Sequence, residues 1–174
     1  KLNVGSTFTI VIPFQIDTSP SLVKKQSDSD TSDNIKGMRI LVTEDNELNS
    51  EIAKELLEDA GAVVTLAKDG REAVSIFKQS HICEFDLILM DIMMPTLNGY
   101  EATQIIRSLS RIDAQTVPIV AMTANAFSHD IQKAKQVGMN DHIAKPIDVK
   151  KMYEVISRYN KGCLLYTSPS PRDL

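Results

Sequence analysis

Cysteine is scarce in this sequence of 174 residues, and positively charged side chains are not in excess. The two cysteines, Cys83 and Cys163, are far apart and form no Cys-x-x-Cys pair, so the sequence indicates neither a zinc site nor a disulfide-rich scaffold. The formal net charge is −4, whereas binding to nucleic acid depends on lysine and arginine side chains that neutralise phosphates. We therefore expect no direct contact with nucleic acid.

A long apolar run and a targeting signal are also missing. No stretch approaches the ~18–20 apolar residues of a membrane-spanning helix, and the first residues lack the pattern of a signal peptide. We expect a cytoplasmic location and no membrane contact for this segment. Because the sequence starts at Lys1 rather than at methionine, we also expect a fragment of a longer protein, and that parent could itself be membrane-anchored.

The length allows one packed domain with appendages, and composition separates the ends from the middle. Residues 1–16 alternate between apolar and polar side chains up to Pro13, which predicts a strand whose hairpin partner is missing. Residues 17–36 are rich in Ser, Asp and Thr and are typical of a flexible linker with a reach of roughly 25 Å. The Pro-Ser-Pro content of residues 161–174 indicates a disordered tail, which resembles translated vector sequence.

Between residues 37 and 160, short apolar runs alternate with segments of helical periodicity. The apolar runs predict five strands, at residues 38–43, 62–67, 85–90, 117–124 and 141–144. A helical pattern follows each of them, and Asp69 with Glu72 predicts a capping box at the start of the second helix. Near-continuous apolar strands are typical of a parallel sheet covered on both faces. We therefore predict a doubly wound α/β fold with a five-stranded parallel sheet.

Polar residues stand where four of the predicted strands end. Glu44 and Asp45 follow the first strand, Asp91 ends the third, Thr123 is near the end of the fourth, and Lys145 follows the fifth. In an open α/β sheet, sites form outside the carboxyl ends of the strands, near the point where the strand order reverses. We therefore expect three carboxylates, a hydroxyl group and an ammonium group to converge at one edge of the sheet.

Such a group of carboxylates calls for a cation. Two carboxylates about 4 Å apart repel each other by about 4 kcal/mol at an effective dielectric constant near 20, and a divalent cation removes that cost. Ligands that are all oxygen suit Mg²⁺ or Mn²⁺ better than zinc. Together with a hydroxyl group and a lysine, they are the parts required to transfer a phosphoryl group to Asp91 and form an acyl phosphate.

Four short motifs resemble the receiver domain of two-component response regulators. They are VTEDNELN (42–49), DIMMPTLNG (91–99), AMTA (121–124) and DHIAKPI (141–147). The motifs occur in the order of that family and at the ends of the corresponding strands, and the resemblance covers residues 37–160. It implies the flavodoxin-like (βα)5 receiver fold.

The resemblance also implies a role for each polar residue. By it, Asp91 is the phosphoacceptor, and the peptide bond between Lys145 and Pro146 is cis. The remaining roles concern the metal and the phosphoryl group: Asp45 is a direct metal ligand, Glu44 a metal-shell carboxylate that acts partly through water, Met93 a backbone-carbonyl ligand, Thr123 the switch hydroxyl and Lys145 the phosphate-binding lysine.

A second resemblance concerns the context of this domain. Residues 4–13, VGSTFTIVIP, resemble the closing strand of a histidine-kinase ATP-binding domain, so that residues 1–16 would be its C-terminal remnant. The ED-N-x-x-N form at residues 44–49 is similar to receivers of hybrid sensor histidine kinases. This context implies two partners: the phosphohistidine of a kinase dimerisation domain and a histidine phosphotransfer protein. The sequence has neither a dimerisation helix with a phosphorylatable histidine nor the glycines of an ATP lid, so we expect the kinase reaction elsewhere in the parent.

Two other classes of function are open to a chain with this pattern. An aspartyl-phosphate hydrolase of the haloacid-dehalogenase type requires a second aspartate two residues after the nucleophile, and Met93 stands there. A protein-interaction module with a receiver fold but no phosphorylation would not require Asp45, Asp91, Thr123 and Lys145 together. Both readings are weaker than the phosphoacceptor hypothesis. A separate response regulator is a third possibility; it would require an output domain, and we do not expect one in the residues that follow Tyr159 in this sequence.

Overall fold

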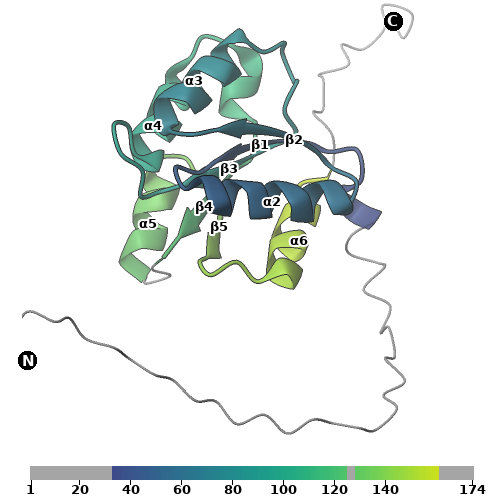
Figure 1. The fold of residues 1–174 in the computed structure, drawn as a ribbon. Helices are drawn as coiled ribbons and strands as arrows, with labels where there is room; N and C mark the ends of the chain where they lie inside the picture. The colour runs from purple at the N-terminus through teal and green to yellow at the C-terminus, as the bar shows by residue number, and fades with distance from the viewer. Residues whose placement is uncertain (1–32, 125–127, 161–174) are drawn as a thin grey trace, which may run out of the picture.

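The computed structural model describes residues 33–124 and 128–160. Their centre is a parallel sheet of five strands in the order β2-β1-β3-β4-β5 (Figure 1). The strands are β1 (Arg39–Thr43), β2 (Val63–Ala67), β3 (Leu87–Asp91), β4 (Ile119–Thr123) and β5 (Asp141–Ala144). Four of them lie within the predicted ranges, and β3 runs one residue further to include Asp91. The segments predicted for residues 1–16 and 161–174 lie outside the described residues.

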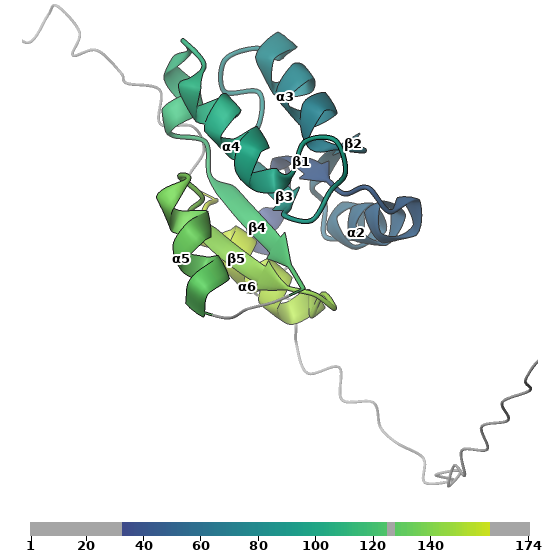
Figure 2. The same ribbon diagram turned by 90° about the vertical axis from the view of Figure 1, so that its left-hand side faces the viewer.

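Helices cover both faces of the sheet. They are α2 (Glu47–Asp59), α3 (Gly70–Gln79), α4 (Gly99–Ser108), α5 (Ser128–Gln136) and α6 (Val149–Ser157), with two short 3-10 helices, η1 (Asp33–Ile35) and η2 (Ile112–Gln115). Helices α2 and α6 contribute to the core on one face, and α3, α4 and α5 contribute to the core on the other (Figures 1 and 2). The predicted doubly wound α/β architecture is confirmed. No helix in residues 33–124 and 128–160 combines the length and apolar character that crossing a bilayer requires.

The central strands are buried on both faces, which explains their unbroken apolar sequence. In β3, Ile88 and Met90 belong to the core beneath α3 and α4, whereas Leu87 and Leu89 belong to the core beneath α2 and α6. A strand with one wet face would alternate apolar and polar residues, but β3 and β4 are buried at every position. Burial includes the polar residues that end these strands, Asp91 and Thr123, so both side chains are held by the packed sheet.

Side chains cap the starts of four helices. The cap residues of α2, α3, α4 and α6 each accept a hydrogen bond from the main-chain N–H three residues on; they are Asn46, Asp69, Asn98 and Asp148. The capping box predicted at α3 requires a correction. Asp69 caps the helix as expected, but Glu72 accepts from the N–H of Lys68 rather than from that of Asp69. A full capping box occurs instead at α4, between Asn98 and Glu101.

The packed unit begins earlier than the predicted boundary at residue 37. Ile35, placed by sequence in the linker of residues 17–36, is fully buried in the core beneath α2 and α6. The side-chain amide of Asn160 donates a hydrogen bond to the carbonyl of Asn34, so the two ends of the described unit meet. A single isoleucine among polar residues gives no periodic signal, and this is why the boundary was misplaced.

Replacing Ile35 by alanine should lower the free energy of unfolding by about 2 to 5 kcal/mol, because it removes buried apolar groups and leaves a cavity. Urea denaturation measures the change. Ile112→Ala is the matched control, because this isoleucine is 69% exposed and its truncation should have little effect. Equal stabilities of the two variants would show that residue 35 belongs to the linker after all.

Candidate functional site

The polar strand ends lie where the chain changes direction across the sheet. From β1 the chain moves to β2 on one side, and then crosses back to β3 on the other side. The crevice of such a sheet opens between β1 and β3, at the carboxyl ends of these two strands. Glu44 follows β1 and Asp91 ends β3, so the topology places both carboxylates at this crevice.

Three carboxylates gather there. One oxygen of each of Glu44, Asp45 and Asp91 lies within 4.8 Å of the others. Glu44 and Asp91 are each only 4% exposed, whereas Asp45 is exposed. A donor set of carboxylate oxygens with one side open to solvent fits a hard divalent cation that keeps water ligands. The expected convergence of these three residues is confirmed.

Lys145 lies between two of these carboxylates. Its Nζ donates to Oε2 of Glu44 at 2.5 Å and to Oδ2 of Asp91 at 2.7 Å. Burial alone would lower the pKa of Lys145, but its hydrogen bonds and charge interactions with Asp91 and Glu44 outweigh burial and raise that pKa. Burial raises the pKa of Asp91 above its ordinary value, although Lys145 acts in the opposite direction. The lysine therefore stays charged and is the cation that holds the two carboxylates together.

Thr123 occupies the same edge. It ends β4 and is buried, and Asp91 is paired in the sheet with the residue before it, Met122. The carbonyl of Thr123 accepts a hydrogen bond from the main-chain N–H of Lys145 at 2.7 Å. This contact joins the ends of β4 and β5 beside Asp91. The peptide bond between Lys145 and Pro146 is cis, as the resemblance implied.

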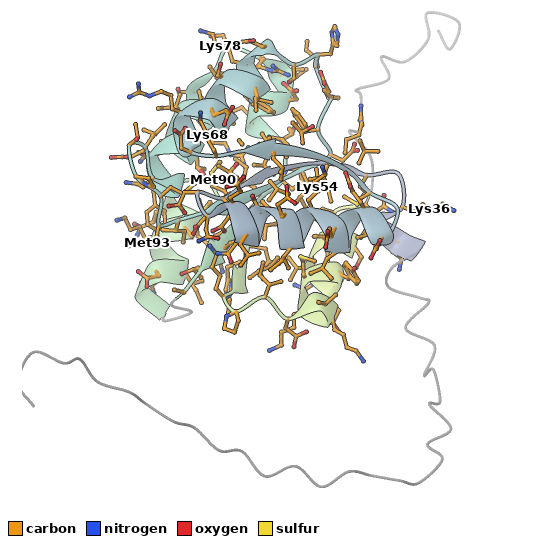
Figure 3. The ribbon with its side chains drawn as sticks, in the orientation of Figure 1. Lys36, Lys54, Lys68, Lys78, Met90 and Met93 are labelled. Atoms are coloured by element: carbon orange, nitrogen blue, oxygen red, sulfur yellow. The ribbon has the colours of Figure 1, made fainter. Side chains whose placement is uncertain are left out.

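The loop after β3 wraps closely around Asp91. The N–H of Met93 donates to Oδ1 of Asp91 at 3.1 Å, while the Met93 side chain is 75% exposed and lies at the surface, in contrast to Met90 inside the fold (Figure 3). The loop closes where the N–H of Gly99 donates to the carbonyl of Ile92. A Cβ atom at Gly99 would lie 2.2 Å from the carbonyl oxygen of Asp91, so this close approach requires glycine.

One contact of the site has no counterpart among the predicted site residues. Nδ2 of Asn49 donates to Oε1 of Glu44 at 3.0 Å. The spacing ED-N-x-x-N contains the signal for it, because Asn46 caps α2 and the residue three positions later lies in the first turn. Sequence reasoning used that spacing only as a resemblance, and so did not assign Asn49 a contact.

A groove of about 510 Å³ opens beside the carboxylates. Glu44 and Lys145 line one part of it, and apolar side chains of α2 and of the loop after β5 line the rest. The full lining is Glu44, Asn49, Ile52, Leu56, Lys145, Pro146 and Ile147. The polar strand ends therefore adjoin a groove whose other side is apolar.

Comparison with known proteins places this arrangement in a family. The response regulator receiver domain matches residues 40–157. The chain belongs to this family. Hybrid signal transduction histidine kinase I of Dictyostelium discoideum is 41% identical over 121 residues, which are 68% of this chain and 7% of that protein. The chain thus spans a small part of the length of such relatives.

Two solved receiver domains share the fold. The receiver domain of a sensor histidine kinase from Pseudomonas aeruginosa is 38% identical, with a TM-score of 0.64 over 71% of this chain and 98% of that one, and its structure has a magnesium ion in the active-site cleft. The receiver domain of Ssk1 from Saccharomyces cerevisiae, solved with the histidine phosphotransfer protein Ypd1, is 31% identical, with a TM-score of 0.65 over 72% of this chain and 90% of that one. The predicted flavodoxin-like receiver fold is confirmed.

Replacing Lys145 by methionine should lower the free energy of unfolding by about 3 kcal/mol at about pH 8, because it leaves buried carboxylates without their cation. The loss should shrink towards about pH 5. A raised pKa of Asp91 means that its protonated form favours the fold, so this contribution is present at low pH and is lost as the pH rises through the folded pKa. Without Lys145 that pKa rises further, and the penalty at high pH grows.

Urea denaturation at both pH values checks this dependence. Lys78→Met is the matched control, since Lys78 is exposed on α3 and its charge should be dispensable at either pH. A loss of stability in Lys145→Met that is the same at both pH values would contradict the pairing with Asp91.

Proposed function

We propose that this chain is the receiver segment of a hybrid sensor histidine kinase, and that Asp91 accepts a phosphoryl group from a phosphohistidine. One observation carries the proposal: the Asp91 carboxylate lies at the carboxyl edge of the sheet, 2.7 Å from the ammonium group of Lys145 and grouped with Glu44 and Asp45. Membership of the receiver family and the similarity to hybrid kinases support the same reading.

The metal that this site would hold is Mg²⁺ or Mn²⁺, with Asp45, Asp91 and the Met93 carbonyl as its ligands and Glu44 acting partly through water. The donor set of oxygen atoms supports this assignment, and so does the magnesium in the Pseudomonas receiver. When bound, the cation offsets the negative charge of the phosphoryl oxygens.

Four residues have separate roles in the transfer of the phosphoryl group. An oxygen of Asp91 forms a bond to phosphorus as the phosphorus–nitrogen bond of the phosphohistidine breaks, and the electron pair stays on the imidazole, which takes up a proton. The ammonium group of Lys145 is 2.7 Å from the Asp91 carboxylate before transfer. After transfer it pairs with an oxygen of the phosphoryl group. The hydroxyl of Thr123 binds another phosphoryl oxygen. The N–H of Met93, which donates to Asp91, keeps the carboxylate oriented.

The phosphodonor is the dimerisation domain of a kinase or a histidine phosphotransfer protein. A partner that carries a histidine must bring its imidazole to Asp91, and the groove beside Glu44 and Lys145 offers an apolar surface for docking. Ile52 on α2 lines this groove and is exposed, and Met93 in the loop after β3 is a further exposed apolar side chain next to Asp91. The complex of Ssk1 with Ypd1 supports a receiver of this fold as a partner of a phosphotransfer protein.

This function assigns the remaining segments of the chain. Residues 1–16 are the end of an ATP-binding domain, residues 17–32 are the tether, and the kinase reaction belongs to the parent protein. The alternative of an aspartyl-phosphate hydrolase fits less well, because the side chain two residues after Asp91 is the exposed thioether of Met93, which has no proton to donate to a leaving group.

Incubating the chain with Mg²⁺ and acetyl phosphate should add one phosphoryl group, and Asp91→Asn should abolish this addition because it removes the attacking carboxylate. Intact-mass spectrometry reads the result. Asp148→Asn is the control, since an asparagine can still cap α6 and Asp148 lies outside the carboxylate group. Equal labelling of wild type and Asp91→Asn would sink the assignment.

Replacing Asp45 by alanine should weaken Mg²⁺ binding more than replacing Glu44 does, because a direct ligand contributes more than one that acts through water. The contacts support this order, since both oxygens of Glu44 already accept from Asn49 and Lys145. Calorimetric titration of the two variants with Mg²⁺ ranks them. The opposite order would exchange the two roles.

A further inference from the structure

The motif ED-N-x-x-N forms one hydrogen-bonded unit that links α2 to Asp91. Oδ1 of Asn46 accepts from the main-chain N–H of Asn49 at 3.0 Å and caps α2. The side chain of Asn49 then donates to Oε1 of Glu44, and Oε2 of Glu44 accepts from Lys145, which also reaches Asp91. Hydrogen bonds thus connect four side chains in series from α2 to the end of β3: Asn49, Glu44, Lys145 and Asp91.

Glu44 has a physical need for this support. Its carboxylate is 4% exposed, and a buried carboxylate oxygen without a donor costs free energy. Glutamate also has one more rotatable bond than aspartate, so its head group is less restricted by the backbone. Lys145 supplies a donor for one oxygen and Asn49 for the other, so that the carboxylate is held from both sides.

We infer that Asn49 is a positioning residue, which holds the Glu44 carboxylate in the orientation that faces Lys145 and the cation. This role rests on the proposed metal site. Asn49 acts only through Glu44: it fixes the rotamer of the carboxylate, and the carboxylate in turn fixes the ammonium group that is shared with Asp91. The glutamate at position 44 and the asparagine at position 49 therefore function as a pair.

A purely structural role for Asn49 makes a different prediction. The cap of α2 uses the main-chain N–H of Asn49 and the side chain of Asn46, so truncating the Asn49 side chain leaves the cap intact. Asn49 is also exposed, and its loss opens no cavity in the core. The thermal unfolding of metal-free Asn49→Ala should accordingly match that of wild type, while its metal binding should not.

The test is a double-mutant cycle in Mg²⁺ affinity, measured by calorimetric titration of the whole chain without a phosphodonor. Asn49→Ala should weaken binding by about tenfold, as loss of a partner that orients a metal ligand typically does. In a Glu44→Ala background the same change should have less than a twofold effect, because the carboxylate to be oriented is absent. Leu48→Ala, a neighbouring exposed change on α2, should leave the affinity unchanged in either background.

A second measurement needs no metal. In NMR spectra of the metal-free chain, Glu44→Ala should shift the side-chain amide signal of Asn49, whereas Leu48→Ala should not. An Asn49→Ala chain that binds Mg²⁺ as wild type does, or that loses affinity equally in both backgrounds, overturns the positioning role and leaves the phosphoacceptor proposal standing. If the wild-type chain binds no Mg²⁺, both the metal site and the positioning role are overturned. If the wild-type chain binds Mg²⁺ but gains no phosphoryl group in the mass-spectrometric test, only the phosphoacceptor proposal is refuted.

Discussion

The rest of the site depends on one ammonium group placed between two buried carboxylates. Glu44 and Asp91 come from different strands, and Lys145 is 101 residues from the first and 54 from the second along the chain. Without a cation, two such carboxylates would repel each other in a region that water reaches poorly. The lysine makes their proximity tolerable in the absence of a metal, and a charged donor is therefore already in place beside Asp91.

The sheet supplies the rigidity that this contact requires. Strands β3 and β4 are buried at every residue, so their ends cannot shift without disturbing the cores on both faces. The loop after β3 adds a second constraint, because Gly99 lets the backbone approach the carbonyl of Asp91 more closely than any residue with a Cβ atom would allow. Asp91 thus lies on a rigid frame, while the Met93 side chain two residues later is exposed to solvent.

The contacts around Glu44 explain why a longer acid suits this position. A carboxylate at the end of β1 must reach Lys145 on one side and α2 on the other, and the extra methylene of glutamate lets its two oxygens face both donors. The three carboxylates therefore have two different roles. In the proposed metal site, Asp45 and Asp91 present oxygens to a cation, and Glu44, which accepts from Asn49 and Lys145, connects that site to the lysine and to α2.

Local sequence determined the elements of this fold and the list of candidate site residues. Unbroken apolar runs predicted the strands. The rule that sites form at the carboxyl ends of parallel strands then predicted the site residues Glu44, Asp45, Asp91, Thr123 and Lys145. Such patterns depend on residues close together in the chain. Two features depend on contacts between distant segments, and only the tertiary structure decided them. Ile35 joins the core although its neighbours are polar, and Lys145 divides its hydrogen bonds between Glu44 and Asp91. A third feature is local but was also decided only in the folded chain: Glu72 accepts from the N–H of Lys68 instead of closing a capping box with the neighbouring N–H of Asp69. A hydrogen bond or a buried side chain is chosen by what packs against it in space, and one-dimensional spacing carries no information about that choice.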